Sequence, residues 1–387
     1  MKKQKICIIG GGLTGLVTAI SLSKLNCDID LITGNIKKNL KNQGTVAVSA
    51  SNLNYLNKLN ISKSLKKIAW PCSTMKLYSE SKSQKFSEIL ELNNNKKLKK
   101  ILYMIQNSKL TKLMINKIKK INCISIKNIG TVSKIFNVGL LKGIKFNNKK
   151  LKYNLIIICT GPNTDLVKNI FKDKKIESSY NEVSITTTLN HSSLNNNITR
   201  QIFLNNEIFA LLPLSNKETS VVWSIKKQEK INNLFFIRNK IKNYANNYLK
   251  NIRFKTKVKY KDLNLLIRNK FYEDRTLLFG DALHLPHPFA GQGFNMTLRD
   301  LFSLDKLLTE KIKLGLDIGS PDILLEYSKE IKLRNFAFLI SLDFLKSCFS
   351  VNNKYFKKIR NDTVKKISTN KFIKSVFFSV ANKGFRF

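Results

Sequence analysis

The sequence is short of acidic residues, histidine and paired cysteine, and each shortage excludes a class of protein. Only 25 Asp and Glu stand against 69 Lys and Arg, and there are 3 His among 387 residues. The 6 cysteines form no CxxC pair and have no His at ligand spacing. We therefore expect neither a metal site nor a disulfide framework, which fits a reducing cytoplasm. So few histidines also leave little material for a Ser-His-Asp triad.

Long apolar runs are also missing. No stretch of about 18 uncharged apolar residues occurs, so we expect no transmembrane helix. The nearest candidate, 336–349, contains Asp343 and Lys346, and the apolar run 6–9 is too short for a secretory signal. These absences predict a cytoplasmic protein, with any membrane contact being peripheral on the inner face of the cell membrane.

Arginine is absent before Arg200, so the net charge of +44 is mostly lysine. Two interpretations stay open. The charge can attract anionic lipid or nucleic acid, or it can reflect an AT-rich genome, which the runs of Asn also suggest. Because the few Arg are scattered and no zinc, RNP or helix-turn-helix signature occurs, we expect no nucleic-acid partner.

What the chain does contain, at its N-terminus, is a β-α-β pattern with a glycine-rich turn. Residues 6–9 are apolar, residues 10–15 read GxGxxG, helical periodicity follows, and a second apolar run covers 29–32. In such a turn the first glycine permits the bend, the second admits a pyrophosphate, and the third lets the helix pack closely. The helix start offers N–H groups to phosphate. We predict dinucleotide binding, with the contacts Gly10, Gly12, Thr14 and Gly15.

The end of the second predicted strand departs from the usual pattern. An acidic residue there normally holds the adenosine ribose hydroxyls. This chain has Thr33 followed by Gly34. A threonine hydroxyl makes one neutral hydrogen bond instead of a charge-assisted pair. We therefore expect Thr33 and Gly34 to contact the cofactor and to anchor its adenosine weakly.

A second motif lies at residues 276–300. An apolar strand, 277–279, runs into Gly280 and Asp281, a Pro- and Gly-rich loop follows, and a helix is expected from about Gly293. Asp281 can accept hydrogen bonds from ribityl or ribose hydroxyls, while small residues let backbone N–H groups approach a flat ring. Taken singly, Asp281 could be a helix cap, and His284 and His287 could be ordinary loop residues.

As a whole, the pattern Gly-Asp-Ala-x-His-x-x-His-Pro-x-Ala-Gly-Gln-Gly-x-Asn at 280–295 resembles a known cofactor motif. It is similar to the second FAD-binding motif of the class A flavoprotein monooxygenases, which have the p-hydroxybenzoate hydroxylase fold. More narrowly, it resembles that of the ubiquinone-biosynthesis hydroxylases. Segment 103–110 resembles a helix of that family. The resemblance implies that FAD is also bound by Gln106, Gly161, Gly280, Asp281, Pro288, Ala290, Gly291, Gln292, Gly293 and Asn295.

Two further positions depart from the family. Thr160 stands where the middle motif usually has Asp, and Gly44 stands where an Arg near the flavin is usual. With Thr33, three polar anchors are altered. Two alternatives to a hydroxylase therefore stay open: a flavin reductase or dehydrogenase on the same fold, and a non-catalytic flavin- or lipid-binding accessory subunit of a quinone-biosynthesis complex.

The resemblance implies a reaction in which NAD(P)H reduces FAD and one atom of O2 enters a phenol ring. The family's substrates are polyprenylated phenols of ubiquinone biosynthesis. An apolar lining that excludes water would favour this chemistry, and each residue in it could equally be plain sheet core. The expected substrate-lining residues are Phe209, Leu211, Leu212, Pro213 and Trp223.

The predicted architecture is α/β, with a Rossmann-like FAD-binding domain, an interleaved mixed-sheet substrate domain and a helical C-terminal region. The FAD-binding domain comprises 1–75, 98–170 and 270–310, the substrate domain 76–97 and 171–269, and the helical region 311–387. The C-terminal region interleaves lysine with aromatic residues. Docking on anionic lipid and ordinary helix packing are both compatible with that composition.

Overall fold

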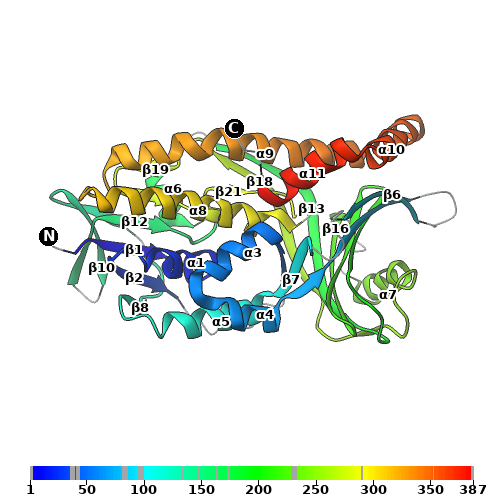
Figure 1. Ribbon diagram of the computed structural model, residues 1–387, viewed down its shortest axis with the longest axis horizontal. Helices are drawn as coiled ribbons and strands as arrows, with labels where there is room; N and C mark the ends of the chain where they lie inside the picture. The colour runs from blue at the N-terminus through cyan, green and yellow to red at the C-terminus, as the bar shows by residue number, and fades with distance from the viewer. Residues whose placement is uncertain are drawn as a thin grey trace.

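The computed structural model describes residues 3–34, 40, 44–80, 86–93, 100–132, 134–146, 149–162, 164–171, 175–227, 233–288, 291–351 and 353–384. A parallel sheet with its helices forms one end of the molecule and a large mixed sheet forms the other (Figure 1). A long helix near the C-terminus, α9 (Pro321–Ser350), runs above both parts. The expected α/β architecture with a helical C-terminal region is confirmed.

The parallel sheet has six strands, of which β19 alone is antiparallel to its neighbour. The two central strands, 5–9 and 155–158, are buried and apolar except for Lys5 at the first position, as expected for a sheet that is covered on both faces. In sheet order the strands are β19 (Tyr272–Glu273), β20 (Thr276–Leu278), β12 (Leu155–Ile158), β1 (Lys5–Ile9), β2 (Asp28–Thr33) and β8 (Ile124–Asn128). The helices around this sheet include α1 (Leu13–Leu22), α5 (Asn107–Ile118), α6 (Asp165–Ile170) and α8 (Gln292–Lys313). The predicted strand, glycine turn, helix and strand at the N-terminus thus form as expected.

The mixed sheet has nine strands and is antiparallel except where β14 meets β5. In sheet order these are β21 (His284–Leu285), β18 (Lys259–Arg268), β13 (Lys175–Asn190), β16 (Glu218–Lys226), β15 (Glu207–Ser215), β14 (Ile198–Leu204), β5 (Thr74–Glu80) and β6 (Phe86–Asn93), with β17 (Arg253–Phe254) beside β13. One face packs on α7 (Leu234–Ala245). The other face looks toward the parallel sheet and the C-terminal helices. Strand β21 belongs to a segment that the sequence assigned to the FAD-binding domain, so the two parts share this edge.

The described residues also form two three-stranded sheets. One consists of β3 (Thr45–Ser49), β7 (Leu102–Gln106) and β4 (Trp70–Cys72), and the other of β11 (Lys149–Tyr153), β10 (Leu141–Phe146) and β9 (Ile135–Val138). Residues 103–106, expected to belong to a helix, are strand, and α5 begins at Asn107. The β-branched and aromatic content of this segment suits a strand. The remaining short helices are α3 (Ala50–Leu56), η1 (Asn57–Ile61), α4 (Ser62–Ile68) and η4 (Gly280–Ala282).

Beyond α9 the chain forms α10 (Lys354–Thr369) and α11 (Lys371–Lys383). In Figure 1 α10 lies at the end of the molecule that carries β6, and α11 runs from there back toward the middle of the molecule. Side chains of α9, α10 and α11 pack with β5 and β6 in one apolar cluster. Of the helices that the structure describes, none has the length and apolar character needed to cross a membrane.

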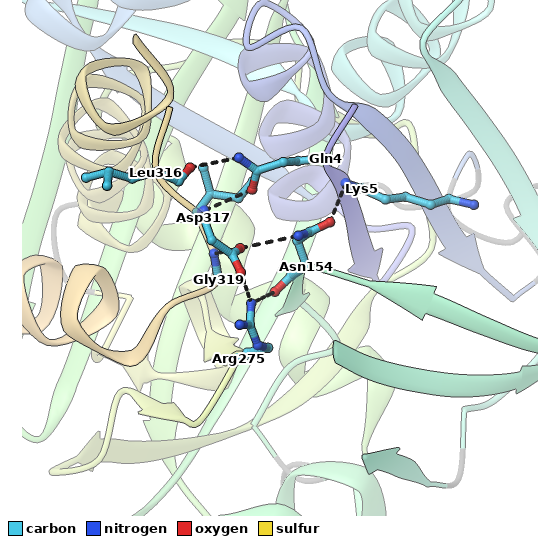
Figure 2. Close-up of polar contacts among 8 residues, drawn as sticks. Gln4, Lys5, Asn154, Arg275, Leu316, Asp317 and Gly319 are labelled. Atoms are coloured by element: carbon cyan, nitrogen blue, oxygen red, sulfur yellow. Dashed lines mark hydrogen bonds and ion pairs between the residues drawn. The ribbon is translucent and has the colours of Figure 1, made fainter. Parts of the chain in front are cut away.

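A polar network ties the amino ends of the parallel strands to the loop after α8 (Figure 2). Asp317 accepts hydrogen bonds from Arg275 Nη1 at 2.6 Å and from Asn154 Nδ2 at 3.3 Å. Asn154 Oδ1 in turn accepts from the Lys5 backbone N–H at 3.0 Å. Gly319 lies so close that a Cβ there would stand 1.7 Å from the Asn154 carbonyl oxygen. These contacts fix one end of the sheet, and its carboxyl ends are left to form the site.

Candidate active site

The two glycine-bearing loops, far apart in the chain, touch each other. Gly280 adopts a φ of +63°, and a Cβ built on it would lie 2.6 Å from Cγ2 of Thr14. Only glycine fits so close an approach at that backbone conformation. The first turn of α1 and the start of the second motif are therefore packed together at the carboxyl ends of β1 and β20.

Each glycine of the first turn has the role that its position predicts. Gly10 has a φ of +129°, and a Cβ there would meet the Cys159 carbonyl oxygen at 2.5 Å. A Cβ on Gly15 would meet the Gly10 carbonyl oxygen at 1.9 Å, so the helix can approach the strand only without a side chain. A Cβ on Gly12 would meet nothing within 4 Å. Gly12 thus faces open space, where a ligand can approach the backbone.

A cleft of about 1030 Å³ opens between these loops and the mixed sheet. The start of α1 lies on one side and the start of α8 on the other, and neither helix has an acidic residue in its first turn. Both helix starts therefore present positive dipole ends without a competing carboxylate. The predicted cofactor residues that line the cleft are Gly10, Gly12, Thr14, Gly34, Gly161, Asp281, Pro288, Gly291 and Gly293.

Six predicted cofactor residues lie behind the lining instead: Gly15, Thr33, Gln106, Gly280, Gln292 and Asn295. Ala290 lies outside the described residues. The two glycines of this group serve the packing described above. Asn295 is fully buried and fastens α8 to the neighbouring strand: its Nδ2 donates to the Ala47 carbonyl at 2.8 Å, and its Oδ1 accepts from the Ser49 backbone N–H at 2.9 Å.

At the end of β2 the structure places one of the two predicted contacts, Gly34, on the cleft and leaves the other, Thr33, outside its lining. Thr33 is 2% exposed, and its Oγ1 has no hydrogen-bond partner among the described residues. Gly34, together with Ile32, lines the cleft. Side chains of successive residues in a strand point to opposite faces. The residue after Thr33 is therefore the one on the side where a ribose could be held. That residue is Gly34, which has no side chain with which to bind the ribose.

A similar one-residue difference occurs at the end of β7. Gln106 precedes α5 and does not reach the cleft, whereas Asn107 lines it. The Asn107 Oδ1 is buried and has no hydrogen-bond partner among the described residues. Asn107 lies in the segment 103–110 that resembles the family, but only Gln106 of that segment was predicted to bind the cofactor. A buried acceptor without a partner is costly, so Asn107 Oδ1 is suited to accept a hydrogen bond from a ligand.

A smaller cavity of about 210 Å³ continues from the cleft toward the mixed sheet. Thr45, Ala47, Ser184, Pro288 and Gly291 line both spaces. The sheet side of the smaller cavity is formed by Ile208, Ala210, Leu212, Val222 and Ser224. We name this space the ring cavity, because its size and mixed lining suit an aromatic ring.

The predicted substrate-lining residues mostly face the other way. Phe209, Leu211 and Trp223 are buried in the cluster around α7, on the opposite face of β15 and β16. Pro213 is buried and lies outside the lining of the ring cavity. Leu212 alone of that set lines it. Alternating residue types predicted the strands, but they did not indicate which face of each strand lies toward the cofactor cleft.

His287 joins three distant segments in a buried network. Its Nε2 lies 3.0 Å from Glu182 Oε2, and Lys346 Nζ of α9 lies 2.8 Å from Glu182 Oε1. Burial opposes ionisation of Glu182, but hydrogen bonds from His287 and Lys346 outweigh it and hold the pKa of Glu182 below its usual value. Burial lowers the pKa of His287. A neutral His287 therefore donates its Nε2 proton to the carboxylate and ties the second motif to β13 and α9.

His284 makes a parallel connection to the same long helix. Its Nε2 lies 2.8 Å from Asp300 Oδ2, which also accepts a hydrogen bond from Asn335 Nδ2 at 2.8 Å. The His284 side chain is 3% exposed and that of Asp300 is 1% exposed. Both histidines of the second motif thus position the loop, as expected. Among the described residues, no group of three or more His, Cys, Asp or Glu side chains could hold a metal ion.

Comparison with known proteins identifies the family. The model of the FAD-binding domain family matches residues 3–338. The chain belongs to this family. The expected FAD cofactor is therefore confirmed, and the match extends over the cleft, the ring cavity and the first part of α9.

Curated relatives of this FAD-binding chain are ubiquinone-pathway enzymes. It is 24% identical to the ubiquinone biosynthesis monooxygenase COQ6, mitochondrial, of Dictyostelium discoideum, over 92% of this chain and 86% of that protein. It is 26% identical to COQ6 of Danio rerio over 53% of this chain and 50% of that protein. The ubiquinone hydroxylase UbiL of Rhodospirillum rubrum matches at 30% identity over 44% of this chain and 41% of UbiL. The chain thus spans about half or less of the length of the latter two relatives.

Solved structures show the same fold. The p-nitrophenol 4-monooxygenase PnpA of Pseudomonas putida superposes with a TM-score of 0.77 at 14% identity, covering 99% of both chains. The HpxO of Klebsiella pneumoniae, solved with FAD and uric acid, superposes with a TM-score of 0.77 at 12% identity, over 98% of this chain and 97% of HpxO. These likenesses confirm the expected flavoprotein monooxygenase fold.

The cleft of this FAD-binding chain fits its cofactor on three observations. Gly12 leaves room for a pyrophosphate at the start of α1. Asp281 and the partnerless Asn107 Oδ1 supply acceptors for hydroxyl or ring N–H groups. Gly291 has a φ of +62°, and a Cβ there would stand 3.0 Å from Cβ of Ala47. Glycine is thus favoured at the start of α8, where the backbone lines the cleft and packs closely on Ala47.

Proposed function

We propose that this chain is an FAD-dependent aromatic-ring hydroxylase that acts on a polyprenylated phenol in ubiquinone biosynthesis. Bound FAD supplies the redox chemistry, taking electrons from NAD(P)H and activating O2. The balanced reaction consumes the phenol, O2, NAD(P)H and one proton, and yields the hydroxylated phenol, NAD(P)⁺ and water. The named activity of COQ6 and UbiL supports the pathway.

The observation that carries the proposal is the continuity between the cofactor cleft and the ring cavity. Pro288 and Gly291 of the second motif line both spaces. A ring placed in the ring cavity therefore lies beside the loop that borders the flavin. Reacting groups held in adjoining spaces gain from proximity and orientation. A non-catalytic accessory subunit does not require this arrangement. A reductase would also need its substrate beside the flavin, so it is the named activity of COQ6 and UbiL that favours hydroxylation.

Within the cleft, each end of the cofactor has its own binding elements. The N–H groups at the start of α1 would bind the pyrophosphate beside Gly12, and Gly34 would face the adenosine ribose. Asp281 would accept hydrogen bonds from the ribityl chain. The start of α8, at Gly291 and Gly293, would place its positive dipole end at the electron-rich edge of the ring system.

In the ring cavity, apolar residues would exclude water and a few polar groups would orient the phenol. Ile208, Ala210 and Leu212 form the apolar wall, while Ser184 and Ser224 offer hydroxyl groups. Water in such a site permits side reactions. His287 also lines this cavity and holds the second motif against β13. Because its Nε2 is held by Glu182, we assign His287 to positioning.

A peripheral membrane contact belongs to this proposal, because a polyprenylated phenol partitions into lipid. The C-terminal helices expose large apolar side chains next to lysines: Leu333 is 63% exposed, Phe344 66%, Tyr355 80% and Phe372 76%. Exposed apolar groups flanked by lysines suit an anionic membrane surface. Sedimentation with vesicles, with and without anionic lipid, tests this contact.

The function itself is tested with purified protein, a prenylated phenol, NAD(P)H and ¹⁸O2. The expected result is a yellow protein whose colour bleaches with NAD(P)H in the absence of O2, and a product that carries one ¹⁸O atom. Bleaching with a product free of ¹⁸O would identify a reductase. Yellow protein that NAD(P)H never bleaches would identify an accessory subunit, and either result would overturn the proposal.

A further inference from the structure

A third cavity, of about 500 Å³, lies between the C-terminal helices and strands β5 and β6. The strands contribute Leu77 and Leu90, and the helices contribute residues such as Leu345, Val364 and Val380. None of the described lining residues is charged, although the chain carries 69 Lys and Arg. Protein interiors are close-packed, with few voids larger than a water molecule. A hollow of this size lies within the range of roughly 300–1,000 Å³ that is usual for ligand sites.

This apolar cavity continues from the ring cavity. Met75 of β5 and Leu102 of β7 line both spaces. The ring cavity in turn shares Pro288 and Gly291 with the cofactor cleft. The three spaces are therefore neighbours in a row that begins at the flavin loop and ends under the C-terminal helices.

The far end of this row reaches the protein surface. Phe344 lines the apolar cavity and is 66% exposed, and Val376 lines it and is 45% exposed. Both belong to the helices that expose apolar side chains to solvent. A long chain that enters the cavity at Met75 can thus leave it between α9 and α11 without crossing a charged barrier among the described lining residues.

The helical wall of the cavity lies mostly beyond the residues that the family model matches. That match ends at residue 338, whereas the helix residues that line the cavity run mostly from Ser341 to Asn382. None of the described lining residues of this cavity also lines the cofactor cleft. Its apolar inner surface therefore suits a ligand group other than the cofactor.

We infer that the apolar cavity binds the isoprenoid tail of the substrate, with the ring in the ring cavity and the first isoprene units passing Met75 and Leu102. A hydrocarbon chain offers no hydrogen bonds, so burial of apolar surface is the interaction that can hold it. The inference rests on the proposed function, since it assumes a prenylated substrate. It adds the location of the tail, its route, and the helices that recognise it.

A fluorescent probe tests the site without turnover. Dansyl-farnesol is titrated into the FAD-loaded protein, and saturable binding at one site is expected. Leu345→Trp takes up part of the cavity and should weaken this binding about tenfold, which corresponds to about 1.4 kcal/mol. Leu325→Trp, on the same helix but 39% exposed and outside the lining, is the matched control and should bind as the wild type does. Equal binding by wild type and Leu345→Trp overturns the inference.

A nearly isosteric variant covers the case in which Leu345→Trp folds poorly. Ser341→Cys places a thiol on the cavity wall with little change in volume. A maleimide should modify this thiol, as read by mass spectrometry of the peptide, and farnesol should slow the reaction severalfold. Unprotected modification at saturating farnesol contradicts the tail site.

Activity separates this inference from the proposed function. Wild type and Leu345→Trp are compared on a farnesylated phenol and on the same phenol without a tail. The expected result is a higher KM of Leu345→Trp for the farnesylated substrate and an unchanged rate on the short one. Probe binding lost in Leu345→Trp while the wild type inserts no oxygen into either phenol would overturn the hydroxylase and support the tail site. Equal KM values on the farnesylated phenol would overturn the tail site alone.

Discussion

The cofactor cleft and the substrate side of the molecule are built from different materials. The cleft is shaped by backbone: glycines at 10, 12, 15, 280 and 291 permit close approaches, and helix starts supply N–H groups. The substrate side is shaped by side chains, with a buried charge network behind the ring cavity and hydrocarbon around the apolar cavity. In the cleft, a few glycines tolerate almost no substitution because the backbone geometry depends on them. A cavity lined by side chains can instead change its ligand preference gradually, as single side chains are substituted.

The largest effect is expected where a buried charge loses its partner. Glu182→Ala leaves Lys346 and His287 without their shared carboxylate, and breaking one member of a buried ion pair costs roughly 3–5 kcal/mol. Urea unfolding of the FAD-loaded protein measures this loss.

Glu182→Gln is the matched control, since it keeps an acceptor for His287 and removes only the charge. We expect it to fall between wild type and Glu182→Ala. A stability of Glu182→Ala within 1 kcal/mol of the wild type, taken here as about a third of the smallest expected loss, would show that this network does not hold the substrate side together.

The next effect tests the claim that backbone shapes the cleft. Gly15→Ala introduces a Cβ 1.9 Å from the Gly10 carbonyl oxygen. Overpacking costs about 1–3 kcal/mol of folding stability. Because the clashing atom belongs to the backbone and cannot move to another rotamer, we expect a loss near the upper end of that range. We also expect reduced FAD content. Thermal unfolding and the flavin absorbance of purified protein measure both.

Gly12→Ala provides the contrast within the same turn. A Cβ at Gly12 meets no atom within 4 Å, so the variant should unfold like the wild type while binding FAD more weakly. An equal loss of stability in Gly12→Ala and Gly15→Ala would contradict this, because it would mean that Gly12 is required for packing and not for access of the cofactor.

A pH effect of smaller size is expected on the substrate side. The pKa of His287 lies below its usual value of 6.5 because the ring is buried. The unfolded chain therefore binds a proton at a higher pH than the folded protein, so stability falls as pH drops below about 6.5. Glu182, whose pKa is lowered, adds a further loss as pH falls below its unfolded value of 4.5.

Melting temperatures between pH 7.5 and 5.5, a range chosen around the unfolded His value of about 6.5, measure this dependence. His287→Gln can still donate to Glu182 but does not titrate, so its melting temperature should change less over the interval. An identical pH dependence in the two proteins would assign the acid sensitivity to other groups.

The same contrast explains how much could be predicted from the sequence. The glycine turn, the second motif, the fold and the helical C-terminal region were predictable because backbone constraints leave a fixed spacing of residue types. The side-chain surfaces were predicted less well. Phe209 and Trp223 were assigned to the ring cavity, yet they face α7, because alternation along a strand does not say which face meets the cofactor.

Contacts between distant segments were beyond the reach of spacing arguments. Glu182, His287 and Lys346 come from a strand, a loop and a C-terminal helix, and nothing local marks them as partners. The apolar cavity is likewise formed only when α9–α11 pack over β5 and β6. At the end of β2, Gly34 lines the cleft and Thr33 does not; at the end of β7, Asn107 lines it and Gln106 does not. The sequence thus located the cleft at these strand ends to within one residue.

The smallest predicted effect uses that one-residue difference to strengthen the cofactor side. Gly34→Glu restores a carboxylate where the ribose hydroxyls are expected, and a Cβ there would meet only the Gly130 carbonyl oxygen at an ordinary 3.7 Å. Hydrogen bonds to a charged acceptor at a partly exposed site should tighten FAD binding a few-fold, on the order of 1 kcal/mol. Fluorescence titration of the apoprotein with FAD measures the change, and Gly34→Gln separates the effect of charge from that of shape.

Thr33→Glu should fail to tighten FAD binding and should lower stability, since Thr33 is 2% exposed and a carboxylate there would be buried without a partner. Tighter binding by Thr33→Glu instead would mean that the strand end presents Thr33, not Gly34, to the adenosine, and that the backbone here is less fixed than the glycine turn beside it.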